Sequence, residues 1–105
     1  MNEADLLRAV TDLIGLLGWK WVHHRPAQTA HGWRTPVQGP LGKGLPDIYA
    51  VHPYRQRAMW IELKTDAGKL SADQDEVIAT LRAAGQTVYV WRPRDLDSIQ
   101  EVLSR

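Results

Sequence analysis

Two short apolar runs, each joined to an acidic residue, constrain the fold of this chain more than any other feature. The first run, Ile48–Val51, follows Gly44-Leu45-Pro46-Asp47, and the second, Met59–Lys64, contains Glu62. Apolar runs of this length, bounded by turn residues, are typical of strands. Pro53-Tyr54 lies between the two runs. We therefore expect a hairpin that brings the two acids side by side.

The second of these strands carries two charges among apolar side chains. Because side chains alternate between the faces of a strand, Glu62 and Lys64 share one face, and Ile61 and Leu63 share the other. Burying a carboxylate and an ammonium group is costly unless they pair or meet a metal. With Asp47 alongside, this pattern indicates a functional centre. The alternative is a surface turn acid next to an edge-strand ion pair.

The residues before the first run predict a helix, a strand and a long loop. The helix spans Glu3–Leu17, is capped by Asn2 and ends at Gly18, and its apolar stripe is Leu6, Leu7, Val10, Leu13, Ile14 and Leu17. Trp19–His24 predicts a strand. Arg25–Leu45 is rich in proline and glycine and has no periodicity, so we predict a loop, of a length that is more often functional than a linker.

The residues after the second run complete an α/β pattern. The predicted elements are a turn at 66–69, a helix from Ser71 to about Ala84, a strand at Thr87–Trp91 and a helix from Asp95 or Asp97. Gln74 stands at the capping-box position of the helix that Ser71 begins, and Gly85 ends it. The order α-β-β-β-α-β-α predicts a small mixed β-sheet flanked by helices, with a right-handed crossover before the last strand.

Composition limits the architecture and the chemistry. With 105 residues, the chain is expected to form one domain, residues 1–105. Cysteine is absent, which excludes disulfides, thiolate metal sites and a catalytic thiol. No apolar stretch approaches the roughly 18 residues of a membrane helix, and the N-terminus lacks the basic start of a signal peptide. These features predict a soluble cytoplasmic protein.

Basic residues are concentrated in two segments that lack acids. The net charge is only +1, yet no Asp or Glu occurs between residues 19 and 46. This first segment carries the cations Lys20, Arg25, Arg34 and Lys43 and the tryptophans Trp19, Trp21 and Trp33. Such a mixture suits phosphate contacts and stacking on unpaired bases, and core or dimer contacts are the alternative for the tryptophans. The second segment, residues 48–61, carries Arg55 and Arg57.

The four histidines do not predict a zinc site. Their spacing matches no zinc motif, and the adjacent His23 and His24 point to opposite faces of a strand. We interpret the histidines as solvated loop residues. The alternative is that His24 or His31 lies near a phosphate.

The pair Pro46-Asp47 followed by Glu62-Leu63-Lys64 resembles the signature of the PD-(D/E)XK nuclease superfamily. Three further features make nearly the whole chain similar to the VRR-NUC branch of that superfamily: Gly44, the helix start Ser71-Ala72-Asp73-Gln74 and the strand Val88–Arg92. The name-giving Val-Arg-Arg is here Val90-Trp91-Arg92, with tryptophan in place of the first arginine. The resemblance implies a restriction-endonuclease-like core, and it points to a phage or bacterial source.

The resemblance also implies hydrolysis of phosphodiesters with Mg²⁺ or Mn²⁺ as cofactor. Asp47 and Glu62 offer the hard oxygen ligands that Mg²⁺ prefers. The family likeness implies the main-chain carbonyl of Leu63 as a further ligand. Lys64, beside the ion, is expected to orient or deprotonate the attacking water.

The family uses two more residues at its active site. One is a glutamate on the first helix, which Glu3 matches best, with Asp5 as its competitor; both are also ordinary first-turn acids favoured by the helix dipole. The other is a glutamine, which Gln74 matches besides its capping role. The predicted nucleic-acid-binding residues are Lys20, Arg25, Arg34, Lys43 and Arg92.

These observations predict a metal-dependent DNA endonuclease. Small members of the resembled family act on branched DNA, which favours a homodimeric Holliday junction resolvase whose two sites cut opposing strands. A nicking or flap endonuclease is the enzymatic alternative, and a non-catalytic DNA-binding protein on a nuclease fold is the other. A metal enzyme for small phosphoesters is disfavoured by the basic, tryptophan-rich segment.

Overall fold

The computed structural model describes residues 1–24 and 37–105 in full, and the main chain of residues 27–29 and 32–34. Its centre is a four-stranded sheet in the order β1-β4-β5-β6. The strands are β1 (Lys20–His23), β4 (Ile48–His52), β5 (Arg57–Leu63) and β6 (Val88–Trp91). The pairs β1–β4 and β4–β5 are antiparallel and β5–β6 is parallel. The predicted mixed α/β fold is therefore confirmed.

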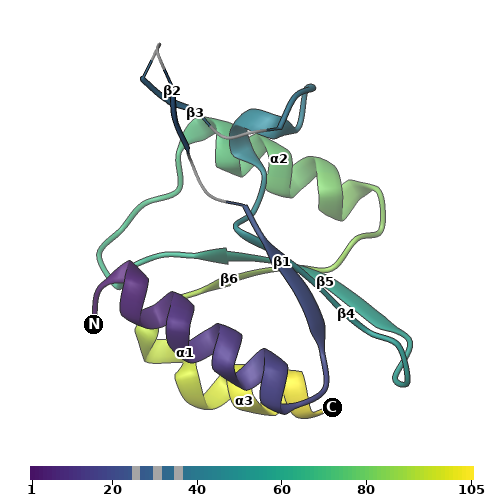
Figure 1. The fold of residues 1–105 in the computed structure, drawn as a ribbon. Coiled ribbons are helices and arrows are strands. Elements are labelled where there is room, and N and C mark those ends of the chain that lie inside the picture. Colours follow the sequence, from purple (N-terminus) through teal and green to yellow (C-terminus); the bar gives the residue numbers. More distant parts are fainter. Residues whose placement is uncertain (25–26, 30–31, 35–36) are drawn as a thin grey trace.

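Helices cover both faces of this sheet (Figure 1). Helices α1 (Glu3–Leu16) and α3 (Leu96–Ser104) lie side by side on one face, and α2 (Ala72–Ala83), which connects the parallel strands β5 and β6, lies on the other. The larger core lies under α1 and α3 and includes Leu6, Ile14, Ile48, Ile61, Ile99 and Leu103. The smaller core lies under α2 and consists of Val77, Ile78, Leu81 and Val88.

The ends of α1 and α2 follow the predicted signals. The Asn2 side chain caps α1 in a capping box with Asp5, and Ser71 caps α2 in a capping box with Gln74. After each helix, a glycine with positive φ lets the chain turn back: Gly18 at 90° and Gly85 at 82°. The caps define where each helix begins, and the glycines define where the chain turns after it.

The segment predicted as a loop, Arg25–Leu45, contains regular structure. It includes an antiparallel two-stranded sheet, β2 (Ala27–Thr29) with β3 (Gly32–Arg34), and a short 3-10 helix, η1 (Gly42–Gly44). The prediction that this whole segment is a loop was therefore wrong. Three-residue strands are too short to establish a recognisable alternation of apolar and polar residues, which explains why the pattern gave no signal.

The first tryptophan of the basic segment belongs to the core. Trp19 is 3% exposed, and its indole Nε1 donates a hydrogen bond of 3.0 Å to the Leu103 carbonyl of α3. The guanidinium of Arg57 lies 5.0 Å from the centre of the Trp19 ring. Trp19 is thus unavailable for stacking on bases or for a dimer contact, because α3 and β5 already enclose it.

The arginines of the second acid-free segment bind the end of α3. Arg57 donates to the carbonyls of Val102, at 2.8 Å, and of Arg105, at 3.2 Å. Arg55 donates to the carbonyls of Ser104 and Arg105. The last carbonyls of a helix lack intrahelical partners and carry partial negative charge. The segment therefore lacks acids at a place where its cations satisfy a helix terminus.

Candidate active site

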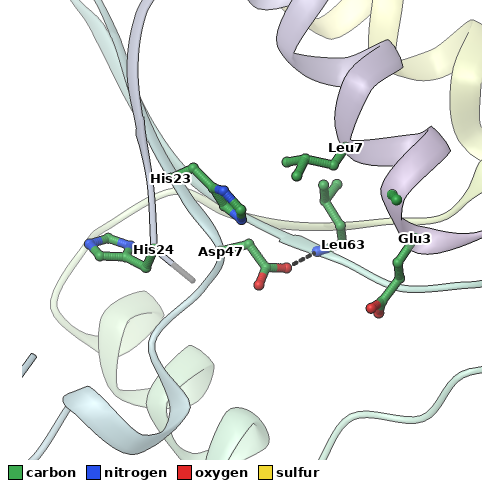
Figure 2. A pocket seen from close by; sticks show the side chains of 7 residues that line it. Glu3, Leu7, His23, His24, Asp47 and Leu63 are labelled. Carbon is green, nitrogen blue, oxygen red and sulfur yellow. Dashed lines mark hydrogen bonds between the residues drawn. The ribbon is translucent and has the colours of Figure 1, made fainter. Parts of the chain in front are cut away.

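The hairpin of β4 and β5 brings the two predicted acids together. Ile48 lies opposite Ile61 in the antiparallel register, so Asp47, one residue earlier, lies opposite Glu62. The Asp47 Oδ2 atom accepts a hydrogen bond of 2.8 Å from the main-chain N–H of Leu63 (Figure 2). This bond fixes one carboxylate oxygen of Asp47 against the end of β5.

Glu62 is the more deeply buried member of this pair. Its side chain is 1% exposed, and its Oε1 has no hydrogen-bond partner among the described residues. Burial raises the pKa of Glu62 to about 9, with further increases from the charge of Asp47, a hydrogen bond to Asp47 and the charge of Glu3; Lys64 acts in the opposite direction. A bound cation would relieve this desolvation and repulsion.

Close packing on α2 sets the position of Asp47. A Cβ atom added to Gly44 would lie 2.3 Å from the main-chain oxygen of Asp73 and 2.9 Å from the main-chain nitrogen of Gln74. Only glycine permits this approach of η1 to the start of α2. Pro46 is fully buried immediately before Asp47. The segment Gly44-Leu45-Pro46-Asp47 is therefore closely packed before β4 begins, and this packing positions Asp47 beside Glu62.

Lys64 follows the last residue of β5, at the start of a turn that Arg92 holds. The main-chain N–H of Lys64 donates to the Trp91 carbonyl at 3.0 Å. The Arg92 Nη1 donates to the carbonyls of Thr65 and Gly68, both at 2.6 Å. The predicted DNA contact of Arg92 stays a prediction, but this nitrogen is already bound to the turn beside Lys64.

A cavity of about 260 Å³ lies beside Asp47 and is lined by Glu3, Ala4, Leu7, His23, His24, Asp47 and Leu63. In Figure 2, the carboxylates of Glu3 and Asp47 lie on either side of Leu63. Asp5 does not line this cavity, and its carboxylate serves the capping box at the start of α1. Of the two acids weighed from the sequence, the geometry thus favours Glu3.

Gln74 lies at the first turn of α2. Its side-chain Oε1 accepts a hydrogen bond of 2.9 Å from the main-chain N–H of Ser71, and the main-chain N–H of Gln74 donates to the Ser71 Oγ at 3.1 Å. Gln74 does not line the cavity beside Asp47. Its predicted catalytic role stays a prediction, and its capping role is confirmed.

The three histidines that the structure describes, His23, His24 and His52, occupy different settings. His23 and His24 line the cavity, with their rings turned in different directions (Figure 2). The His24 main-chain N–H donates to the Asp47 carbonyl at 2.8 Å, its ring stacks on Trp60, and its Nδ1 is buried with no partner among the described residues. His52 is buried, and its Nε2 donates to the Leu17 carbonyl at 3.2 Å.

The interpretation of these histidines as solvated was wrong for His52. It also overlooked the position of His24, which the β1–β4 pairing brings next to Asp47. Sequence spacing gave no hint of either, because both contacts are made between segments distant in the chain. His31 lies outside the described residues.

Two of the predicted DNA-binding cations can be placed in full. Lys20 is exposed at the start of β1. Lys43 is exposed on η1, and its Nζ lies 3.4 Å from the Asp73 carboxylate, so part of its charge is matched within the chain. Arg25 lies outside the described residues, and only the main chain of Arg34 is described. DNA binding by this set stays a prediction.

The donor set fits a magnesium ion that keeps several waters. Among the fully described residues, no group of three or more His, Asp or Glu side chains converges closely enough to hold a metal. Mg²⁺ is commonly bound through one or two carboxylates, with waters and substrate phosphate completing its shell. Asp47 and the unpartnered Oε1 of Glu62 supply such a pair.

The chain also matches a known protein family. The VRR-NUC domain model matches residues 21–95, most of the chain. The chain belongs to the VRR-NUC family. The matched range includes Asp47, Glu62, Lys64 and Gln74, and it begins after α1, which carries Glu3. No curated protein and no solved structure gave a significant match.

VRR-NUC membership implies a nuclease-type function. In the part of the chain that the structure describes, no helix has the length and apolar character needed to span a membrane.

Proposed function

We propose that this VRR-NUC protein is a Mg²⁺- or Mn²⁺-dependent DNA endonuclease that hydrolyses phosphodiester bonds. The observation that carries this proposal is the buried Glu62, whose Oε1 lacks a partner and whose pKa is raised to about 9 beside Asp47. A purely structural residue at this position would be apolar, because an unpaired buried carboxyl group costs stability. A divalent cation is the natural partner of such a pair.

Each residue of the pair and its neighbours has a separate task in this proposal. Asp47, Glu62 and the Leu63 carbonyl would hold the metal. When bound, the ion would supply an activated water and neutralise charge on the scissile phosphate. Lys64 orients or deprotonates the attacking water. Glu3, across the cavity, and Gln74, at the start of α2, are the two further residues of the proposed active site.

The proposed substrate is branched DNA, and the proposed active form is a homodimer. Each chain carries a single Asp47–Glu62 pair, so two cuts on a symmetric junction require two chains. Strand β1 is at the edge of the sheet, where unpaired main-chain groups favour association. Val22 on β1 and Leu16 at the end of α1 are exposed apolar residues, and they support a contact surface there, without Trp19.

A substrate panel tests the enzymatic proposal. Purified protein is incubated with Mg²⁺ or with Mn²⁺ and matched labelled linear, nicked, flapped and four-way DNA, with EDTA in parallel reactions. We expect metal-dependent cleavage that is fastest on a branched substrate. DNA binding without cleavage in either metal would favour the non-catalytic alternative.

A cruciform plasmid and light scattering test the dimer. A resolvase dimer linearises a supercoiled cruciform by paired cuts, and its mass at micromolar concentration is twice that of one chain. If the protein is a monomer that only nicks the cruciform, its activity is that of a nicking endonuclease. If it cuts flapped DNA in preference to the other substrates, its activity is that of a flap endonuclease.

The basic segment has its own test. Replacing Arg25, Arg34 and Lys43 by alanine together is expected to weaken DNA binding, and each lost phosphate contact lowers the log–log salt slope by about 0.9 on duplex DNA. An unchanged slope would place the phosphate contacts elsewhere.

A further inference from the structure

A second cavity continues the first along α1 and β1. It has a volume of about 360 Å³ and is lined by Ala4, Leu7, Arg8, Thr11, Trp21 and His23. Ala4, Leu7 and His23 also line the cavity beside Asp47. The two cavities are therefore neighbours along one path, which we call the α1–β1 groove. A ligand lying in its outer part approaches Asp47 at its inner end.

The outer part of the groove presents an aromatic ring to solvent. Trp21 is 45% exposed, although an indole ring gains more from burial than most side chains. In strand β1, Trp21 and His23 project from the same face, and both line the groove. Trp19, by contrast, is enclosed by the core. Trp21 is thus the described tryptophan of the basic segment that has a surface free for a ligand.

The charge in the outer groove is positive. Arg8 is its charged lining residue, and it makes no ion pair or side-chain hydrogen bond with the described residues. Asp12, one turn further along α1, does not line the groove. An exposed aromatic ring next to an uncommitted cation is the arrangement that binds a base together with its phosphate.

We propose that the α1–β1 groove binds an unpaired nucleotide of a DNA strand, with its base stacked on Trp21 and a neighbouring phosphate contacting Arg8. The base must be unpaired because bases within a duplex already stack on their neighbours and offer no free face. The volume of about 360 Å³ falls at the lower end of the roughly 300–1,000 Å³ typical of ligand pockets. This size suits one nucleotide rather than a duplex.

This inference rests on the proposed DNA endonuclease function and narrows its substrate. A strand held at Trp21 would run along Leu7 and His23 toward Asp47. The groove therefore selects DNA with a single-stranded branch or an opened junction over a continuous duplex. Cleavage is then expected near the boundary between unpaired and paired DNA.

Equilibrium binding in EDTA tests the groove without requiring cleavage. The probes are a labelled ten-nucleotide deoxythymidine strand and a blunt duplex of equal length. Trp21→Ala is expected to weaken binding of the single strand by about 5- to 150-fold, which corresponds to the loss of one base stack, and to leave duplex binding within about twofold. Trp21→Phe keeps an aromatic face and should retain most of the affinity.

Two further variants complete the design. Arg8→Ala should lower the log–log salt slope on the single strand by about 0.7. Tyr54→Ala is the matched control, because Tyr54 is 92% exposed in the turn between β4 and β5, away from the groove, and it should bind as the wild type does. Circular dichroism checks that each variant is folded.

Three results would overturn the inference. The first is that folded Trp21→Ala binds the single strand as tightly as the wild type does. The second is that this variant loses equal affinity for the single strand and the duplex. The third is that the variant no longer forms a dimer in light scattering, which would make the groove a contact between copies of the chain. If Trp21-dependent binding is found but no metal supports cleavage, the groove stands and the endonuclease proposal fails. If cleavage occurs without Trp21-dependent binding, the groove fails and the endonuclease stands.

Discussion

The raised pKa of Glu62 predicts an unusual dependence of stability on pH when no metal is bound. The folded protein keeps the Glu62 proton up to a pKa of about 9, whereas the ordinary value is 4.5. Between these values, the unfolded chain releases this proton and the folded chain does not. The contribution of Glu62 to stability is therefore fully present below pH 4.5 and is lost as the pH rises toward 9.

The size of the effect follows from one proton. Each pH unit within the window lowers the free energy of unfolding by about 1.4 kcal/mol. From pH 5 to pH 8, the loss reaches about 4 kcal/mol, a large share of the roughly 5–15 kcal/mol by which domains are stable. Glu62→Gln keeps the shape of the side chain and removes this titration. The expected difference between the variant and the wild type thus grows with pH.

Urea unfolding in EDTA at pH 5, 6, 7 and 8 measures this difference. Glu62→Gln should lose much less stability than the wild type over this range, and Mg²⁺ should stabilise the wild type most at the alkaline end, because the metal binds the ionised pair. Glu76→Gln, a change of an exposed acid on α2, is the control and should parallel the wild type. Parallel curves for the wild type and Glu62→Gln would refute the argument.

Two other variants test how the site is held. Gly44→Ala places a Cβ 2.3 Å from the Asp73 main-chain oxygen, and overpacking of this kind should cost about 1–3 kcal/mol in urea unfolding; a wild-type midpoint would contradict the close approach. Arg92→Ala frees the carbonyls of Thr65 and Gly68. We expect cleavage to fall by up to about 100-fold as Lys64 shifts, whereas a salt slope lowered by about 0.9 would instead assign Arg92 a phosphate contact.

Local sequence signals predicted most of the fold. The capping pairs of α1 and α2 are three residues apart in the chain, so the sequence alone identifies where each helix begins. The strands β4 and β5 were evident because each is a mainly apolar run and turn residues separate the two runs. The pairing of the same two strands places Asp47 opposite Glu62, and this is why the acid pair could be predicted.

What the sequence could not reveal depends on contacts between distant segments. Trp19 looked like a nucleic-acid contact until its hydrogen bond to the Leu103 carbonyl of α3 placed it in the core. Arg57 was only a cation of an acid-free segment in the sequence, and its place at the end of α3 became evident from its hydrogen bond to the Val102 carbonyl. His24 reaches Asp47 only through the β1–β4 pairing. No local pattern encodes which cation or ring will meet which helix end.

The proposed function depends above all on a catalytic divalent cation held by Asp47 and Glu62. Its most direct test is cleavage of branched DNA by the wild type, Asp47→Ala and Glu62→Ala over a Mg²⁺ titration, with Glu76→Ala as the control. We expect the wild type and the control to cleave with saturable Mg²⁺ dependence, and both site variants to be folded and inactive at every concentration. Cleavage by either site variant at the wild-type rate, or cleavage by the wild-type protein in EDTA, would contradict the claim.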